Sequence, residues 1–214
     1  MRSTDSCVSR ALRATFLAAA CAFASSAIAG GPLWVVPSGG TLKPARWEGT
    51  VDVYLDKGNL SVSPYCEYDE NYQCKVDENG NVIYPVLDQQ AGDDLVAFTV
   101  DQWSGVPTSS FRARIAGRSP VDIDGSNVWD YIGKYNGGGI QTIYDADNTV
   151  IDALTGGNGY GVLGIASPEY LADEGSTQIV EGWQVIGGSF LGLTSTGPVS
   201  GIVTHEFGHA INLT

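Results

Sequence analysis

Two histidines and a glutamate carry the clearest chemical signal in this chain. The only histidines are His205 and His209, and Glu206 follows the first of them. On a helix, a spacing of four residues puts both imidazoles on one face, one turn apart, where both can reach a single ion. Zn²⁺ bound there lowers the pKa of its water from about 15.7 towards 7. Glu206 can then take the proton as that water attacks a peptide carbonyl, and later give it to the leaving amine. We therefore predict a catalytic zinc site with His205 and His209 as ligands and Glu206 as general base.

The same pattern would also occur on a helix with two incidental histidines. The apolar residues around the motif would bury such a helix, and buried histidines need polar partners. A metal ion is the simplest partner. The apolar residues are Ile202, Val203, Phe207, Ala210 and Ile211.

The element that must present the motif is predicted to be a helix over residues 199–213. Thr196 can offer a hydroxyl to the first free amides, and Pro198 fits the first turn. Upstream, apolar patterns predict another helix over 95–103 and several short strands, while 150–154 is compatible with either structure. The predicted strands cover residues 33–36, 50–55, 82–86, 111–116, 140–144, 161–166 and 177–186.

The sequence from His205 onward resembles the metzincin motif of zinc peptidases. In that motif a glycine three residues after the second histidine turns the chain, and a third histidine follows three residues later. Asn212 occupies the glycine position, and asparagine is the non-glycine residue that most readily adopts the left-handed backbone such a turn needs. The third ligand would fall immediately after Thr214. With two histidines alone, we expect residues 30–214 to bind zinc weakly and to show little turnover.

Two upstream segments are similar to matrixin-type metzincins. Residues 100–111 resemble the end of the first helix and the entry to the next strand, and residues 161–168 resemble the edge strand that pairs with substrate backbone. Gly164, Ile165 and Ala166 are therefore candidate substrate-binding residues. The resemblance covers roughly residues 93–214 and implies an α/β (α+β) zincin-like fold. Such a fold has a twisted mixed β-sheet, a long backing helix and an active-site helix.

Matrixins also carry a structural zinc and a cysteine that caps the catalytic zinc in the pro-segment. This chain has no histidine upstream of the motif, so we expect one catalytic zinc only. Neither Cys66 nor Cys74 stands in a pro-segment motif of that kind. We expect these two cysteines to close a disulfide around residues 67–73 in an oxidising compartment. Zinc ligation by them is the alternative, although no histidine is nearby.

Residues 1–29 read as an export signal. Three arginines precede the uncharged apolar run 14–24, and Ala27-Ile28-Ala29 gives the small residues that a signal peptidase cuts after. The mature chain would begin at Gly30 and be secreted, or be periplasmic or on the cell surface. A lipid anchor on Cys21 is the minor alternative. No segment approaches about 20 uninterrupted apolar residues, so we expect no membrane span.

The mature chain is strongly acidic. Without residues 1–29 it contains 8 Lys and Arg against 23 Asp and Glu, a formal net charge of −15. Such a surface argues against nucleic acid and anionic membranes as partners, because both repel negative charge. A polypeptide substrate is the partner that the zinc motif predicts.

Acidic loops can also bind calcium. Asp145, Asp147, Asn148 and Asp152 alternate oxygen-bearing side chains along one short segment, so a Ca²⁺ site is conceivable there, with a polar turn as the alternative. Residues 77–81 offer oxygen ligands too, but their sequence favours a plain hairpin turn.

These observations divide the chain into an export signal (1–29), a β-rich segment (30–92) and a metzincin-like catalytic domain (93–214). The middle segment could be a pro-segment, an extra β-element or the first strands of the catalytic domain. The predicted function is a secreted zinc metalloendopeptidase. One alternative is an extracellular adhesin or surface-layer domain that keeps the peptidase fold without turnover, and another is a zinc hydrolase acting on cell-wall amides.

Overall fold

The computed structural model describes residues 31–62, 66–83, 86–189 and 196–214. The predicted export signal and the alternative anchor Cys21 lie outside these residues. The described residues from Pro32 onward belong to one unit. Among them, no helix has both the length and the apolar character that crossing a membrane requires.

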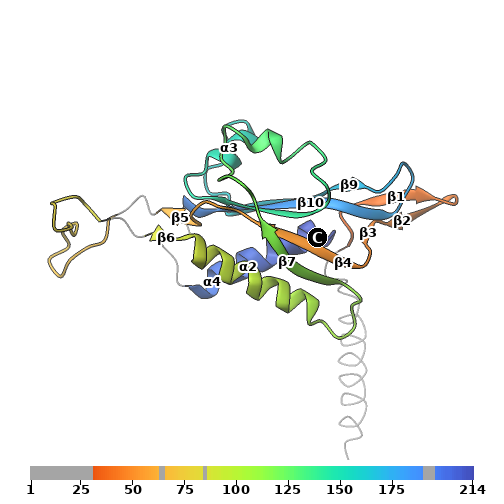
Figure 1. The fold of residues 1–214 in the computed structure, drawn as a ribbon, viewed down its shortest axis with the longest axis horizontal. Helices are drawn as coiled ribbons and strands as arrows, with labels where there is room; N and C mark the ends of the chain where they lie inside the picture. The colour runs from red at the N-terminus through yellow and green to blue at the C-terminus, as the bar shows by residue number, and fades with distance from the viewer. Residues whose placement is uncertain (1–30, 63–65, 84–85, 190–195) are drawn as a thin grey trace, which may run out of the picture. The chain divides into compact units, whose positions relative to one another are not determined.

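A six-stranded mixed β-sheet forms the middle layer of this unit (Figure 1). Five of its strands pair in parallel, and the sixth, β9, pairs antiparallel with β10. The order across the sheet is β3 (Arg46–Trp47), β10 (Gln178–Gly187), β8 (Gly139–Asp145), β4 (Thr50–Leu55) and β7 (Arg112–Arg118), with β9 (Gly164–Leu171) on the other side of β10 from β8. The sequence therefore forms the mixed α/β architecture that we expected in general terms.

Helices cover both faces of the sheet. Two long helices, α2 (Gln89–Ser104) and α4 (Thr196–Ala210), lie on one face, and the short helix α3 (Thr149–Thr155) lies on the other with a 3₁₀ turn at Val128–Asp130 (Figure 1). Two small two-stranded sheets complete the described elements. They are β1 (Val35–Ser38) with β2 (Thr41–Pro44), and β5 (Ser61–Val62) with β6 (Val86–Leu87).

Alternating side chains of the sheet build one core on each face, because successive residues of a strand point to opposite sides. In β10, Ile186 packs with the residues of α2 and α4, and Val185 packs with those of α3. In β8, Ile140 and Tyr144 belong to the first core and Ile143 to the second. The buried strands therefore combine apolar residues on both faces, as parallel strands between two helical layers do.

Local sequence explains the start and the packing of α2. Asp88 caps the helix, since its side chain accepts a hydrogen bond of 2.9 Å from the Ala91 amide. The buried positions Gly92, Val96 and Val100 repeat every four residues and face the sheet. A Cβ at Gly92 would lie 2.7 Å from the Tyr144 ring, so glycine permits the close approach of helix and sheet there. The helix includes the predicted range 95–103 and begins six residues earlier.

The predicted boundary between residues 92 and 93 falls inside α2 and does not divide the structure. The sheet takes β3 and β4 from before that boundary and β7, β8, β9 and β10 from after it. β4 lies between β7 and β8, and its Val53 is fully buried. Residues 50–55 therefore form a strand of the same domain as the His205–His209 motif, which is one of the three roles considered for the segment 30–92.

Residues 66–83 form a local hairpin of their own. The Sγ atoms of Cys66 and Cys74 lie at disulfide distance, with their Cα atoms 5.4 Å apart. The expected turn over 77–81 is present, because the Asp77 amide donates to the Asn81 carbonyl and the Asp77 carboxylate accepts from the Asn79 and Asn81 amides. The predicted strand 82–86 is reduced to an isolated bridge at Val82, followed by β6 from Val86.

Candidate metal centre

The helix α4 brings the two histidines of the motif together. The Nε2 atoms of His205 and His209 lie 3.0 Å apart. In a tetrahedral zinc site with Zn–N bonds of about 2.0–2.1 Å, two ligating nitrogens stand about 3.3 Å from each other. The donor pair therefore fits a zinc ion with only a small adjustment of the rings.

A backbone carbonyl orients the second imidazole. Nδ1 of His209 lies 2.8 Å from the carbonyl oxygen of Leu213. A carbonyl can only accept, so Nδ1 carries the proton and Nε2 keeps its lone pair towards His205. Metal-binding histidines in proteins are commonly oriented by such an outer hydrogen bond.

The Glu206 side chain lies in the contact between α4 and the first residue of β9. Its side chain is buried, with 7% of the residue exposed. A Cβ at Gly164, the first residue of β9, would lie 2.5 Å from Cγ of Glu206. Burial raises the pKa of the Glu206 carboxyl, and the neighbouring His209 and His205 act in the opposite direction. A carboxylate whose pKa is raised is a stronger base, which suits proton transfer near neutral pH.

Contacts with α2 fix the orientation of α4. The indole Nε1 of Trp103 donates to the Thr204 carbonyl at 3.1 Å, and the hydroxyls of Thr99 and Thr204 lie 3.2 Å apart. On the buried side, Phe207 meets Phe111 edge to face with ring centroids 6.2 Å apart. The side of α4 that carries the histidines therefore faces solvent, and the opposite side packs into the core.

The strand β9 supplies the edge of the sheet beside Glu206. The predicted substrate-binding residues Gly164, Ile165 and Ala166 are its first three residues, and they pair with Ile186, Val185 and Gln184 of β10. Ala166 packs with the core that contains α4, whereas Ile165 packs with the opposite core. Within the described residues β9 has no strand on its other side. That side can therefore offer backbone groups to an extended peptide.

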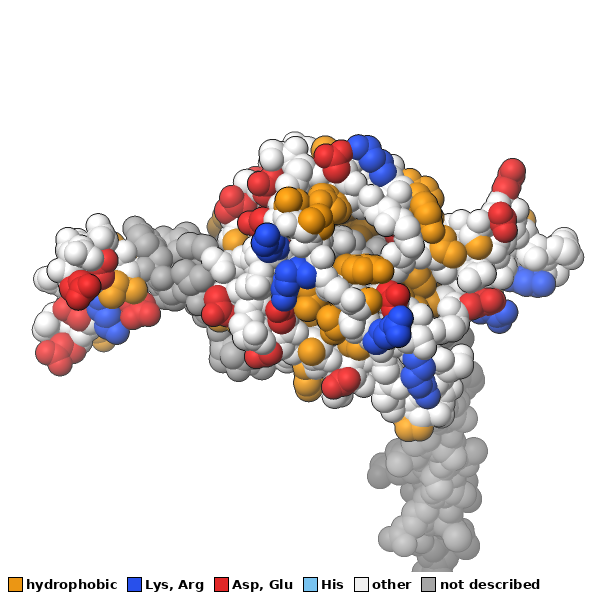
Figure 2. Space-filling model, viewed as in Figure 1, with side chains coloured by type: hydrophobic (Ala, Val, Ile, Leu, Met, Phe, Trp, Pro, Cys, Tyr) orange, Lys and Arg blue, Asp and Glu red, His pale blue; other side chains and the backbone are white. Residues whose placement is uncertain are grey.

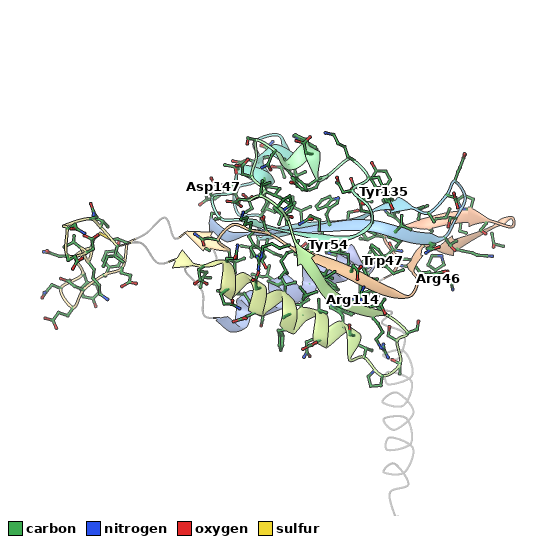
Figure 3. All side chains as sticks on the ribbon, viewed as in Figure 1. Arg46, Trp47, Tyr54, Arg114, Tyr135 and Asp147 are labelled. Atoms are coloured by element: carbon green, nitrogen blue, oxygen red, sulfur yellow. A yellow bond between two sulfur atoms is a disulfide. The ribbon has the colours of Figure 1, made fainter. Side chains whose placement is uncertain are left out.

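The predicted calcium residues act mainly as caps around α3, where Asp147 is seen beside the helix (Figure 3). The buried Asp145 accepts hydrogen bonds from the Val150 and Ile151 amides. Asp147 accepts from the hydroxyl and amide of Thr149. Burial raises the pKa of Asp145, the two amides lower it, and the charges of Asp147 and Asp152 raise it further.

The remaining two residues of that prediction meet each other. Nδ2 of Asn148 lies 3.4 Å from an oxygen of Asp152, which also accepts from the Gly159 amide. In the part of the chain that the structure describes, no three His, Cys, Asp or Glu side chains form a group able to hold a metal ion. Calcium binding by these residues stays a prediction.

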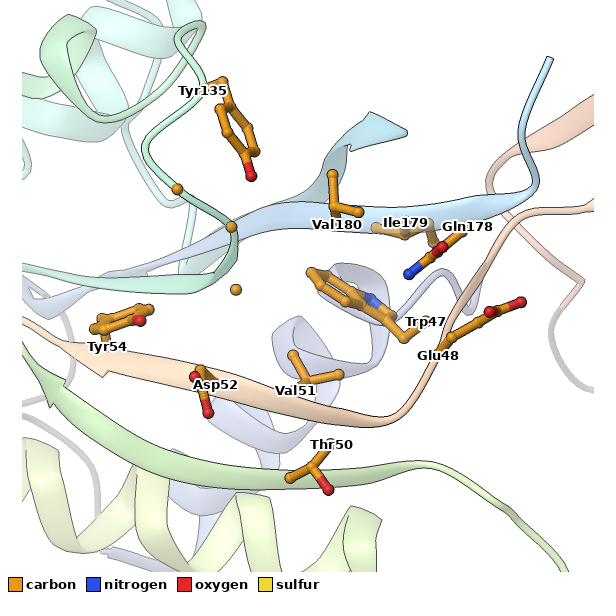
Figure 4. A pocket seen from close by; sticks show the side chains of 13 residues that line it. Trp47, Glu48, Thr50, Val51, Asp52, Tyr54, Tyr135, Gln178, Ile179 and Val180 are labelled. Carbon is orange, nitrogen blue, oxygen red and sulfur yellow. The ribbon is translucent and has the colours of Figure 1, made fainter. Parts of the chain in front are cut away.

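Sequence reasoning did not find a hollow at the break in the sheet where β8 begins. It has a volume of about 280 Å³ and is lined by Trp47, Tyr54 and Tyr135 among others (Figures 3 and 4). On the face shown in Figure 2, hydrophobic side chains gather in this middle region. Its carboxylates already have partners, since Asp52 pairs with Arg114 at 2.6 Å. None of the three motif residues lines this hollow.

Comparison with protein-family models, with curated proteins and with solved structures finds no match to this chain.

Proposed function

We propose that this chain is the catalytic part of a secreted zinc-dependent endopeptidase of the metzincin type. The observation that carries the proposal is the arrangement on α4. Its two imidazole Nε2 atoms lie 3.0 Å apart, and the buried Glu206 on the same helix lies against Gly164, the first residue of the edge strand β9. A metal site, a general base and a peptide-binding edge thus meet at one place.

The fold supports the same proposal. A metzincin-like enzyme needs a twisted mixed sheet, a long helix behind it and a helix that carries the zinc motif. The chain has these parts in its sheet, α2 and α4. The left-handed turn expected at the glycine position of the motif is present, since Asn212 has φ +77°.

Each residue of the proposed site would have its own role in the reaction. Zinc, when bound by His205 and His209, would polarise the substrate carbonyl and acidify the attacking water. The free side of β9 would hold the substrate backbone extended, beside Glu206. Glu206 would take the proton of the attacking water and pass it to the leaving amine. The Leu213 carbonyl would keep His209 in the tautomer that binds metal.

Three variants test the proposal in the mature protein from residue 30 to the end of its reading frame. Casein and a panel of quenched fluorescent peptides would serve as substrates. We expect hydrolysis that chelators abolish and zinc restores. Glu206→Gln should reduce kcat by about 10²–10⁴-fold because it removes the proton acceptor, while zinc binding persists. His205→Ala and His209→Ala should lose both.

Each rival function predicts a different result. Glu206→Gln that hydrolyses peptides at the wild-type rate would overturn the assignment of the base. A protein that binds zinc and cleaves cell-wall amides but no peptides would indicate a hydrolase of another substrate class. A protein that cleaves neither substrate and keeps its binding partner in the Glu206→Gln variant would indicate an adhesin.

A further inference from the structure

The helix α4 ends in a turn whose hydrogen bonds are specific. The Leu213 amide donates to the Gly208 carbonyl at 2.9 Å, and the Asn212 amide donates to the His209 carbonyl at 2.9 Å. This is the Schellman arrangement, in which the residue after the helix takes a left-handed backbone. Asn212 takes that position with φ +77°. Glycine would satisfy the backbone requirement equally well, so the turn alone does not explain the asparagine.

The side chain of Asn212 explains it. Asn212 is 3% exposed, and its amide group meets the β1–β2 region. Oδ1 accepts from the Trp34 amide at 2.6 Å, and Nδ2 donates to the carbonyls of Trp34 and Ala45 at 3.1 and 2.7 Å. One buried side chain therefore joins the base of the β1–β2 hairpin, at the residue before β1 and the residue after β2, to the end of the motif helix.

Further contacts bring the same N-terminal segment to the same turn. The indole Nε1 of Trp47 donates to the Ala210 carbonyl at 3.1 Å. The Leu33 amide donates to the Asn212 carbonyl at 3.4 Å, and Pro32 forms a bridge with Leu213. Partners for the end of α4 thus come from residues 32–47.

The turn that is held in this way also carries the group that orients a metal ligand. The carbonyl of Leu213 accepts from Nδ1 of His209 at 2.8 Å. Leu213 directly follows Asn212, so the position of its carbonyl depends on how the turn is anchored. The chain of contacts runs from Trp34 and Ala45 through Asn212 to Leu213 and then to His209.

We propose that residues 32–47 form a built-in clamp and that Asn212 is a positioning residue, which together fix the Leu213 carbonyl and hence the His209 imidazole. This inference rests on the proposed zinc site. It also assigns residues 32–47 to the permanent enzyme and not to a removable pro-segment, because their removal would take away the partners of Asn212 and of the Ala210 carbonyl.

Asn212→Gly is the decisive variant, because glycine keeps the left-handed turn and loses only the anchor. We expect its zinc dissociation constant to rise by about 10–100-fold, the usual effect of losing an outer hydrogen-bonding partner. We also expect a lower kcat with KM nearly unchanged. Asn212→Ala should lose more thermal stability than Asn212→Gly, since alanine is also strained at positive φ.

Ser119→Ala is the control. Ser119 is 6% exposed, and its hydroxyl accepts from Gln141 Nε2 at 2.8 Å, so the variant loses one partly buried hydrogen bond where Asn212→Gly loses three. That hydrogen bond involves neither α4 nor the N-terminal hairpin. We expect a loss of stability smaller than that of Asn212→Gly, with zinc affinity and kcat unchanged.

A measurement on metal-free protein separates the clamp from the zinc proposal. The ¹⁵N shifts of the His209 imidazole report its tautomer. We expect one tautomer, protonated at Nδ1, in the wild type and a mixture in Asn212→Gly. The same tautomer in both proteins, or the same zinc affinity in both, would overturn the clamp. Absence of zinc binding and hydrolysis in the wild type would overturn the proposed function, and the tautomer measurement would still decide whether the clamp exists.

Discussion

Replacing Gly164 by alanine adds one methyl group at the contact between β9 and Glu206. The new Cβ would lie 2.5 Å from Cγ and 2.8 Å from Cδ of Glu206, and 3.0 Å from the carbonyl oxygen of Val185. Carbon atoms in ordinary contact stand about 3.5–4.0 Å apart. Val185 is held in β10 between β9 and β8. The Glu206 side chain must therefore move by about 1 Å.

A displacement of that size strongly lowers the reaction rate when the displaced group is the general base. Misplacing a reacting group by about 1 Å costs roughly 10²-fold in rate. We therefore expect kcat/KM of Gly164→Ala to fall by about 10²-fold, equivalent to about 2.7 kcal/mol of transition-state stabilisation. Zinc affinity should stay within about threefold of wild type, because the added methyl group meets Glu206 and Val185 and not a proposed zinc ligand. Loss of an outer contact that does orient a ligand typically lowers the affinity about 10–100-fold. Steady-state kinetics with a quenched fluorescent peptide and a competitive zinc titration measure the two quantities.

Gly201→Ala is the control for this experiment. Gly201 lies on α4, and a Cβ there would have nothing within 4 Å. Alanine should raise the free energy of unfolding by up to about 1 kcal/mol through helix propensity, with kcat unchanged. If Gly164→Ala keeps kcat/KM within about threefold of wild type, Glu206 does not need the space that glycine leaves, and the reasoning fails.

Three further predictions concern other parts of the fold. Burial raises the pKa of Asp56 to about 6, above its value of about 3.9 in an unfolded chain, so its contribution to stability is full below about pH 4 and is lost as the pH rises through about 6. The wild type should therefore lose about 3 kcal/mol of unfolding free energy between pH 4 and 7, and Asp56→Asn should not show this loss. Urea titrations in which the variant loses as much unfolding free energy as the wild type over this pH range would contradict the prediction. Serine at Cys66 and Cys74 should remove about 2–3 kcal/mol of local stabilisation and expose residues 66–83 to proteolysis, while a simultaneous loss of zinc affinity would show that the hairpin is not independent of the metal centre. Trp103→Phe should lower the unfolding free energy by about 1 kcal/mol by removing the donor to the Thr204 carbonyl, and thermal denaturation that shows no change would show that this bond does not support α4.

Local patterns in the sequence were sufficient for most of the elements. The range predicted for one strand, 50–55, agrees with β4, and the predicted helices over 95–103 and 199–213 correspond to α2 and α4. These elements have a clear apolar period or a cap such as Asp88. The edge strand was predicted over 161–166 and runs from Gly164 to Leu171. Its late start follows from the left-handed backbone of Gly161, φ +79°, which a strand does not accept.

The pairing of elements could not be read from such patterns, because it depends on contacts between distant residues. The bond between Trp34 and Asn212 joins positions 178 residues apart. The sequence indicated that Asn212 could adopt a left-handed backbone, and the structure agrees. Nothing in the sequence indicated that its side chain meets the N-terminal hairpin. For the same reason, the sequence left three roles open for residues 30–92, and only the pairing of β4 with β7 and β8 shows that residues 50–55 belong to the main sheet.

The two chemical groups of α4 depend on different distant segments. Glu206 lies against the first residue of β9, and His209 is oriented by the turn that Asn212 ties to the base of the β1–β2 hairpin. The helix itself sets only the spacing of these side chains, since an isolated helix of this length is marginal in water and leaves side chains free to change rotamer. The five-residue motif on the helix therefore needs two other segments of the chain. A strand must lie against Glu206, and the turn anchored by the hairpin must orient His209. This explains why we expect substitutions at Gly164 and Asn212, which bear no reactive group, to change the proposed chemistry as strongly as substitutions beside the proposed zinc ligands.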